Sequence, residues 1–181
     1  ELGLPRGWLD KMKNAIRLNC PQFNTTRMVR DYALRAYLST SERYLAISQN
    51  NYQPAKDLAH WKENLFAHWY NIKIDSVDFS TDSEVKVNQA VQVKCQLALT
   101  ELKPEDLQVE LYQGAVNDKG DLPDGYASSM SYQGQDGNGL SIYTGEIVYQ
   151  SSGLQGCQVR VLPKHELLSG LYETGLILWA E

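Results

Sequence analysis

Apolar residues in the first seventy positions recur at steps of three and four, which is the period of one face of an α-helix. One such run consists of Trp8, Leu9, Met12, Ala15 and Ile16. Cys20 and Pro21 end this run, because a proline disfavours helical backbone at the residue before it. The pattern therefore predicts a first helix that ends close to residue 20.

A second helix is predicted to follow, with Thr25 or Thr26 as its N-terminal cap. Its apolar stripe consists of Val29, Tyr32, Ala33, Ala36 and Tyr37. Its surface carries Arg27, Arg30 and Asp31, and the four-residue spacing of Arg27 and Asp31 allows them to pair. Two interpretations of these charges stay open: an ordinary solvated helix face, or a surface that meets a partner.

The rest of the helical half contains a predicted kink and one more helix. Residues 39–42, Ser-Thr-Ser-Glu, have the spacing of a capping box, which predicts that the helix kinks or restarts there. Another helix is predicted after Pro54, where a proline suits the first helical turn. Its stripe consists of Leu58, Trp61, Leu65 and Trp69.

Beyond Tyr70 the period of the apolar pattern changes from about 3.6 to 2, the period of a β-strand. Alternating or strand-like runs occur at residues 72–79, 91–99, 107–113, 141–149, 157–161 and 175–180. About seven short strands separated by glycine-rich turns are typical of an antiparallel sandwich. The predicted fold class is therefore α+β: a helical segment over residues 1–70 and a β-sandwich domain over residues 71–181, immunoglobulin-like in the loose sense.

Charge and glycine distribution supports a change of structure near residue 70. Residues 1–70 hold 10 of the 17 basic side chains and 6 of the 22 acidic ones, so the acidic excess lies in the second half. Of the 13 glycines, only Gly3 and Gly7 precede residue 100. The first half is therefore predicted to be compact and helical, and the second half to be rich in turns.

Composition excludes several classes of protein. The chain has no apolar run of the roughly 18 residues that span a bilayer, and its N-terminus lacks the pattern of a signal peptide. A pI of 5.2 without a basic run argues against nucleic-acid binding. Three scattered cysteines suit neither a disulfide framework nor a zinc site, which favours a reducing, cytoplasmic compartment. The first residue is Glu1 rather than Met, which favours a fragment of a longer protein.

Candidate catalytic and metal-binding residues are few. His60 and His68 lie about 12 Å apart along one helix, too far to share a metal ion. His165 stands alone and is expected to be a solvated loop residue. Glu105 and Asp106, with Glu101, either form paired carboxylates or simply bound a strand. Phosphate loops and the serine nucleophile elbow have no motif here, so no catalytic, cofactor-binding or metal-binding residue is predicted.

The tyrosines of the second half have two open interpretations. An aromatic face is an apolar platform on which a sugar ring can stack. Tyrosine is also an ordinary strand residue. The residues concerned are Tyr112, Tyr126, Tyr132, Tyr143 and Tyr149.

Two stretches resemble a known family. "WLDKMKNAI", followed by "PQFNTTRMVRDYA", resembles the last part of the catalytic region of α-glucan (glycogen/starch) phosphorylases, where a late helix opens with a similar motif. The second half, at residues 101–114 and 156–163, is similar to the C-terminal extension in the bacterial branch called α-glucan family phosphorylase. The matching motif residues of the late helix are Phe23, Thr25, Arg27, Asp31, Tyr32 and Ala33.

This resemblance implies reversible phosphorolysis of α-1,4-glucan to glucose 1-phosphate by the parent enzyme, a glycosyltransferase that holds pyridoxal phosphate on a lysine. That lysine lies in a Glu-Ala-Ser-Gly-Thr-x-Asn-Met-Lys stretch, of which this chain shares only Met12 and Lys13. The resemblance therefore implies a C-terminal, non-catalytic portion without the cofactor, whose partner is the rest of the phosphorylase chain. Arg27, Arg30 and Asp31 are then expected to meet residues outside this sequence.

Alternative functions are a free-standing carbohydrate-binding module, with α-glucan as its ligand, and a scaffold that binds another protein. Either way, the alternating strands predict that Cys95 and Cys157 are buried thiols without a bond between them. Residues 1–70 are expected to leave a large apolar or charged face open.

Overall fold

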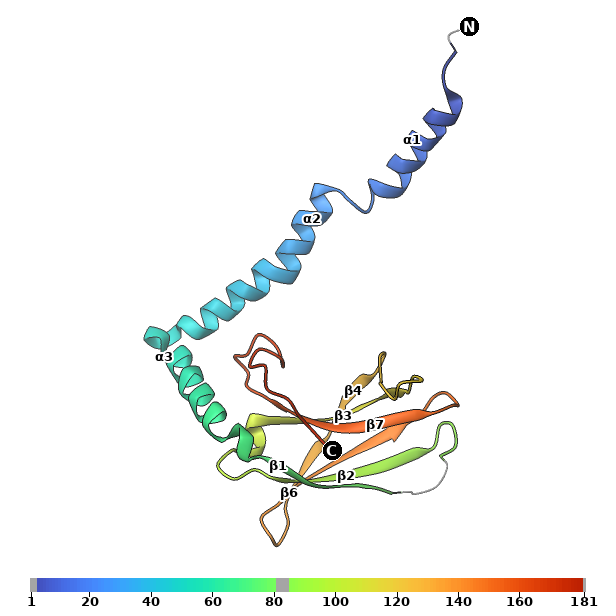
Figure 1. Cartoon of the computed structure of the whole chain (residues 1–181). Helices are drawn as coiled ribbons and strands as arrows, with labels where there is room; N and C mark the ends of the chain where they lie inside the picture. Colours follow the sequence, from blue (N-terminus) through green and yellow to red (C-terminus); the bar gives the residue numbers. More distant parts are fainter. Residues whose placement is uncertain (1–2, 81–84, 181) are drawn as a thin grey trace. The chain divides into compact units, whose positions relative to one another are not determined.

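A computed structural model describes residues 3–80 and 85–180 of the chain (Figure 1). The chain forms two compact units, Glu1–Lys56 and Asp57–Glu181. The described secondary structure of the first unit consists of helices. The second unit combines the end of a helix with two β-sheets. Among the described residues, no helix has both the length and the hydrophobicity of a membrane span.

The first two helices are α1 (Arg6–Asn19) and α2 (Thr25–Tyr32), as the apolar periodicity predicted. The capping residue of α2 is Asn24, however, and not Thr25 or Thr26. Asn24 has extended backbone and its Oδ1 accepts a hydrogen bond from the Arg27 amide at 2.8 Å, whereas Thr25 is already helical. A π-helical turn, Ala33–Tyr37, connects α2 to α3 (Leu38–His68).

The predicted kink at residues 39–42 is wrong, because α3 breaks at Gln49–Tyr52 instead. The hydroxyl of Ser39 donates to the carbonyl of Ala36 at 3.1 Å, so it supports the existing helix and caps no new one. Asn50 and Asn51 have positive φ, a left-handed backbone that asparagine adopts more readily than most residues. The helix therefore breaks at the two asparagines, about ten residues after the position that the capping-box spacing predicted.

The helix predicted after Pro54 is confirmed as the last part of α3. Leu58, Leu65 and Trp69 are buried and Trp61 is half-buried, so the predicted stripe packs as expected. Leu65 and Trp69 belong to the same core cluster as the sheets. The second compact unit therefore begins at Asp57, whereas the division into domains at residues 70 and 71 stays a prediction.

Eight antiparallel strands in the described part of the chain form two sheets that lie face to face, which confirms the α+β class with a β-sandwich (Figure 1). The first sheet has the order β1 (Lys73–Phe79), β2 (Ala90–Ala98), β6 (Ser141–Val148) and β5 (Ser131–Gln135). The second has the order β4 (Tyr126–Ser129), β3 (Leu107–Ala115), β7 (Gln155–Pro163) and β8 (Leu178–Trp179).

Strands β4 and β5 were not predicted, because their residues are mostly polar and do not alternate. Met130 lies between them, where the chain passes from the second sheet to the first, and only 7% of it is exposed. Its amide donates to the carbonyl of Val109 at 2.8 Å. These two strands are thus held by ladder hydrogen bonds and one buried side chain, and not by an apolar face of their own.

The core lies between the sheets and contains alternate residues of the central strands. Fully buried members are Leu65, Val93, Cys95, Leu97, Val109, Leu111, Ile147, Val159 and Val161. All three cysteines are free: Cys95 is buried, Cys157 is half-buried and Cys20 is exposed. The prediction that Cys95 and Cys157 are not bonded to each other is confirmed, whereas the predicted burial holds for Cys95 and is wrong for Cys157.

Candidate functional site

Residues 3–56 expose a series of large apolar side chains, which we call the helical apolar surface. None of these residues is buried, and exposed fractions reach 70% at Leu18 and 78% at Phe23. Monomeric proteins rarely leave so much apolar helix surface in water. The surface consists of Trp8, Ile16, Leu18, Phe23, Tyr32, Leu34, Tyr37 and Leu45. Its pattern indicates helices that pack on something other than their own unit.

The charges of α2 pair with one another. Arg27 Nη1 lies 3.6 Å from one oxygen of Asp31, and Arg30 Nε lies 3.8 Å from the other. Exposed pairs of this kind contribute about 0–1 kcal/mol. The structure thus brings together the three charges named from the sequence, and a solvated helix face is sufficient to explain them within this chain.

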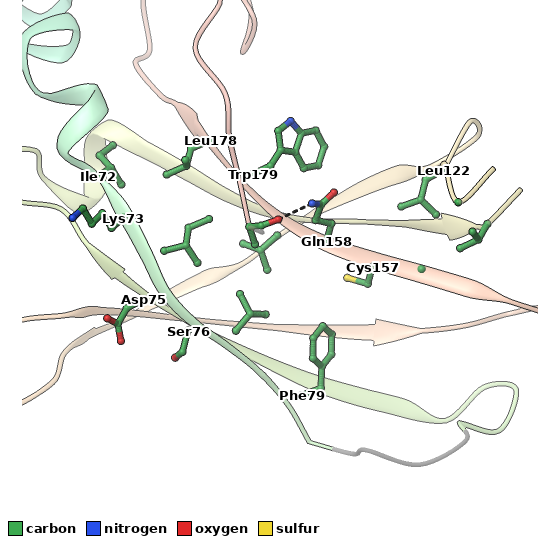
Figure 2. A pocket seen from close by; sticks show the side chains of 17 residues that line it. Ile72, Lys73, Asp75, Ser76, Phe79, Leu122, Cys157, Gln158, Leu178 and Trp179 are labelled. Atoms are coloured by element: carbon green, nitrogen blue, oxygen red, sulfur yellow. Dashed lines mark hydrogen bonds between the residues drawn. The ribbon is translucent and has the colours of Figure 1, made fainter.

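A second surface feature is a hollow of about 920 Å³ between the edge strands β1 and β8, which we call the β1–β8 hollow (Figure 2). Strand β1 is the edge of the first sheet and β8 the edge of the second, so the sandwich is open along this side. Most of the lining side chains are apolar: Ile72, Ile74, Val77, Phe79, Val116, Leu122, Val159, Leu178, Trp179 and Ala180.

Two polar side chains that line the β1–β8 hollow, Gln158 and Ser76, have hydrogen-bond partners within the chain. The Gln158 amide donates to the carbonyl of Ala180 at 2.6 Å, drawn as a dashed line in Figure 2, and the Ser76 hydroxyl donates to Gln96 at 3.0 Å. Burial raises the pKa of the Cys157 thiol to about 11, so it is neutral at pH 7 and a poor nucleophile. The hollow is therefore suited to apolar packing and not to acid–base or nucleophilic chemistry.

An arginine surrounded by aromatic rings anchors the C-terminal segment on the second sheet. Arg160 on β7 pairs with Glu110 on β3, with Nη2 and Oε2 2.7 Å apart, and both side chains are buried. Its guanidinium lies 4.9 Å from the ring centre of Tyr112, 5.5 Å from that of Trp179 and 5.7 Å from that of Tyr172. The charge is thus compensated by a carboxylate and by aromatic faces.

This cluster was not predicted from the sequence. Glu110 and Arg160 stand at polar positions of alternating strands, where exposed charges are also common, so the pattern alone does not distinguish them. Because Tyr112 contacts both Arg160 and Trp179, its ring has a structural role and is not a free sugar platform.

The three histidines lie apart and have local partners. His60 Nδ1 is 3.4 Å from a Glu63 oxygen, and His68 donates to the Asn64 carbonyl at 3.0 Å. His165 is not a solvated loop residue as predicted: it is half-buried, and its ring lies 4.8 Å from that of Trp61. In the part of the chain that the structure describes, no group of three His, Cys, Asp or Glu side chains could hold a metal ion.

The carboxylates around Pro104 have a structural role in part. Asp106 accepts a hydrogen bond from the Trp61 indole at 2.7 Å and one from the Lys103 amide at 3.1 Å. It therefore ties α3 to the turn before β3, which favours the strand-boundary interpretation over a catalytic pair.

The surroundings of Lys13 and Lys73 do not fit pyridoxal phosphate. Lys13, from the Met-Lys pair that the family's cofactor motif shares, is exposed on α1. Lys73 lines the β1–β8 hollow, but next to Asp75 and in an open, largely apolar groove. A lysine that forms a Schiff base with this cofactor needs an enclosed site that also binds its phosphate. Neither lysine has such surroundings.

Comparison with known proteins identifies the family. The family model described as glycogen phosphorylase C-terminal domain matches residues 69–181. The glycogen phosphorylase of Mycobacterium tuberculosis is 28% identical over 183 residues, a match that covers 99% of this chain and 21% of that protein.

Two other relatives also match nearly the whole of this chain and a small part of their own length. The glycogen phosphorylase of Mycobacterium bovis is 26% identical over 99% of this chain and 21% of its own length. The maltodextrin phosphorylase of Thermococcus litoralis is 26% identical over 95% of this chain and 20% of its own length. This chain therefore spans about a fifth of the length of the curated relatives it matches. Because the family model covers more than half of the chain, the protein belongs to the glycogen phosphorylase C-terminal domain family.

Proposed function

We propose that this chain is the C-terminal, non-catalytic portion of an α-1,4-glucan phosphorylase that converts glucan and phosphate to glucose 1-phosphate. The observation that carries the proposal is the helical apolar surface, whose side chains have no core within residues 3–56. Short helices in water gain most of their stability from packing an apolar face. The rest of the phosphorylase chain is the proposed partner of this face.

The charges and the cofactor fit the same proposal. Arg27, Arg30 and Asp31 lie on α2, among the exposed apolar residues, and are proposed to contact the missing body of the enzyme. Pyridoxal phosphate is proposed to bind elsewhere in the longer chain, since neither Lys13 nor Lys73 has suitable surroundings here. The proposed compartment is the cytoplasm, which the three free thiols support.

Reconstitution from two polypeptides tests this proposal. This chain and the preceding part of the parent phosphorylase are produced separately, mixed and analysed by size-exclusion chromatography and a phosphorolysis assay. We expect a stable complex, activity in the complex, and no glucose 1-phosphate from this chain alone. Borohydride trapping of the isolated chain is expected to give no pyridoxyl-lysine adduct.

A matched pair of substitutions locates the interface. Leu18 is 70% exposed on α1 and Leu154 is 73% exposed on the sandwich unit, so the two leucines are equally accessible. Leu18→Asp is expected to weaken the complex at least tenfold, because it places a charge in the helical apolar surface, while Leu154→Asp leaves binding unchanged. Equal binding by both variants, or turnover by the isolated chain, would contradict the proposal.

A second candidate function, binding of carbohydrate by the sandwich, is favoured by one specific observation. Tyr132 is 44% exposed, and it lines a hollow beside the buried Tyr143.

A further inference from the structure

The edge of strand β7 is open for part of its length. Strand β3 pairs with all of β7 on one side, but β8 on the other side pairs only with Arg160 and Val161. The Ala180 amide donates to the carbonyl of Val159 at 2.9 Å, and beyond this bond no strand of the described residues pairs with that side of β7. Residues 156–158 therefore present an unpaired edge, which we call the open β7 edge.

The backbone of Cys157 supplies a hydrogen-bond donor and an acceptor at the open β7 edge. Backbone groups two residues apart in a strand point to the same side. Since the carbonyl of Val159 points towards β8, the amide and carbonyl of Cys157 point to that side too. This stretch lines the β1–β8 hollow, so another chain that enters the hollow can reach these groups (Figure 2).

The inner face of the sandwich is incompletely covered at the same place. Phe79 pairs in register with Val93, and opposite residues of an antiparallel pair point to the same face. Val93 belongs to the core and is 1% exposed, whereas Phe79 is 41% exposed. Val77 and Cys157 also pack against the core and are only half-buried. Apolar side chains from another segment would complete the core here.

The other edges of the two sheets are protected against pairing with another strand. Strand β1 has a bulge between Ile74 and Ser76 and exposed charges at Lys73 and Asp75. Strand β5 also has an irregular register, and β4 has only four residues. Bulges, charges and short strands are the usual means of protecting an edge. The open β7 edge consists of Gly, Cys and Gln, and its register with β3 is continuous, so it has none of these features.

The shape and charge of the hollow favour an inserted segment over a second copy of this chain. Neighbouring strands lie about 4.8 Å apart. Because the open β7 edge lines a hollow, two such edges cannot approach each other to that distance. Lys73 and Asp75 contribute one charge of each sign to the lining, so an uncharged segment fits best. This chain spans about a fifth of the length of its curated relatives, and the remainder of such a protein can supply the segment.

We infer that an extended, uncharged segment of the rest of the phosphorylase chain adds to the second sheet beside β7. Its backbone is hydrogen-bonded to Cys157, and its alternate apolar side chains pack on Val77 and Phe79. In strand addition, main-chain hydrogen bonds provide affinity and side-chain pockets provide specificity. The inference rests on the proposed function, which supplies the partner, and it adds a second docking surface to the helical apolar surface.

Hydrogen exchange of backbone amides tests this inference in the natural sequence. The probe is the separately produced preceding part of the parent phosphorylase, mixed with the 181-residue chain. We expect the Cys157 amide to exchange at least tenfold more slowly in the complex than in the isolated chain. Residues 131–135 of β5, an edge strand outside the hollow, are the internal control and should exchange at the same rate in both. Exchange of the Cys157 amide at its free rate in the complex would overturn the inference.

A matched pair of phenylalanines tests the side-chain contacts. Phe79 is 41% exposed in the hollow, and Phe66 is 49% exposed on α3 outside it. Phe79→Ala is expected to weaken the complex at least threefold, and Phe66→Ala to leave it unchanged. Circular dichroism checks that both variants fold, and the exchange measurement depends on neither of them. Equal binding by the two variants would refute the contact with the hollow.

The inference and the proposed function fail in different ways. A complex that forms without protection of Cys157 disproves the added strand and leaves the proposed function intact. Absence of any complex contradicts the proposed function and, with it, this inference. Exchange at Cys157 that slows in the isolated chain as its concentration rises would assign the hollow to a second copy and overturn the inference.

Discussion

The two compact units of this chain use apolar residues in opposite ways. In residues 3–56 no side chain is buried, although large apolar residues are frequent. In the unit that begins at Asp57, Cys95, Leu97, Leu111 and Ile147 are completely inaccessible to solvent. The sandwich provides both layers of its own core, whereas the helices present one layer without a second. An apolar stripe therefore predicts a buried face, but the partner need not belong to the same chain segment.

The largest expected effect concerns the charged cluster of the sandwich unit. Arg160→Met leaves Glu110 buried without its charged partner and with only the hydrogen bond from Gln108, which should lower the free energy of unfolding by about 3–5 kcal/mol. Urea unfolding followed by far-UV circular dichroism measures the loss. Replacing both residues with methionine is the control, because removing a whole buried pair is often nearly neutral. A double variant as unstable as the single one would show that the aromatic contacts, and not the unpaired charge, are decisive.

The next prediction compares the same substitution in the two units. Leu97 is fully buried, so Leu97→Ala should lower the free energy of unfolding of the sandwich by about 2–5 kcal/mol. Leu18 is 70% exposed, so Leu18→Ala should change the stability of the isolated chain by less than about 0.5 kcal/mol. Denaturant unfolding of both variants measures the difference. A comparable loss in Leu18→Ala would mean that the helical apolar surface already has a core within this chain.

The parts of the fold that were predictable from the sequence have strong local signals. Helices α1 and α2 and the end of α3 follow a helical period, and β2 and β7 alternate clearly. The cap at Asn24 could also have been found, since asparagine is at least as good a capping residue as threonine. It was missed because two threonines follow it directly.

Other features depend on contacts between distant segments. The polar strands β4 and β5 exist because β3 and β6 offer them hydrogen-bonding edges, and their composition alone does not reveal this. The break at Gln49–Tyr52 lies just before Pro54, where a new helix was predicted, but the left-handed backbone of Asn50 and Asn51 is not marked by a glycine.

The candidate sites, too, depend on contacts between segments that are distant in the sequence. Sequence analysis named five tyrosines as possible sugar platforms, but only the register of β5 and β6 brings Tyr132 beside Tyr143. The register of β3 and β7 places Tyr112 beside Arg160, so its ring is not available as a sugar platform. Residue type suggests a chemistry, and strand pairing decides which of the residues share a surface.

The smallest expected effect tests whether the end of α3 belongs to the sandwich unit. Lys62 on α3 lies 2.6 Å from Glu173, in the segment before β8, and the Glu173 side chain is 19% exposed. Burial acts to raise the pKa of Glu173, but hydrogen bonds from Lys62 and Ser169 outweigh it and lower the pKa from 4.5 to about 2. This carboxylate therefore stabilises the fold above pH 4.5, and its contribution is lost as the pH falls from about 4.5 to about 2.

Because this pair lies near the surface, we expect its contribution to be no more than about 1 kcal/mol. The measurement is the free energy of unfolding between pH 2 and pH 6 for the natural chain and for Lys62→Met. The variant should lose part of the pH dependence, since Ser169 still donates to Glu173 through its hydroxyl. Lys56→Met, a change of the same kind in the first compact unit, should leave the pH dependence unaltered. If Lys62→Met keeps the full pH dependence, the hydrogen bonds from Ser169 are sufficient to lower the pKa of Glu173, and Lys62 does not help to hold α3 on the sandwich.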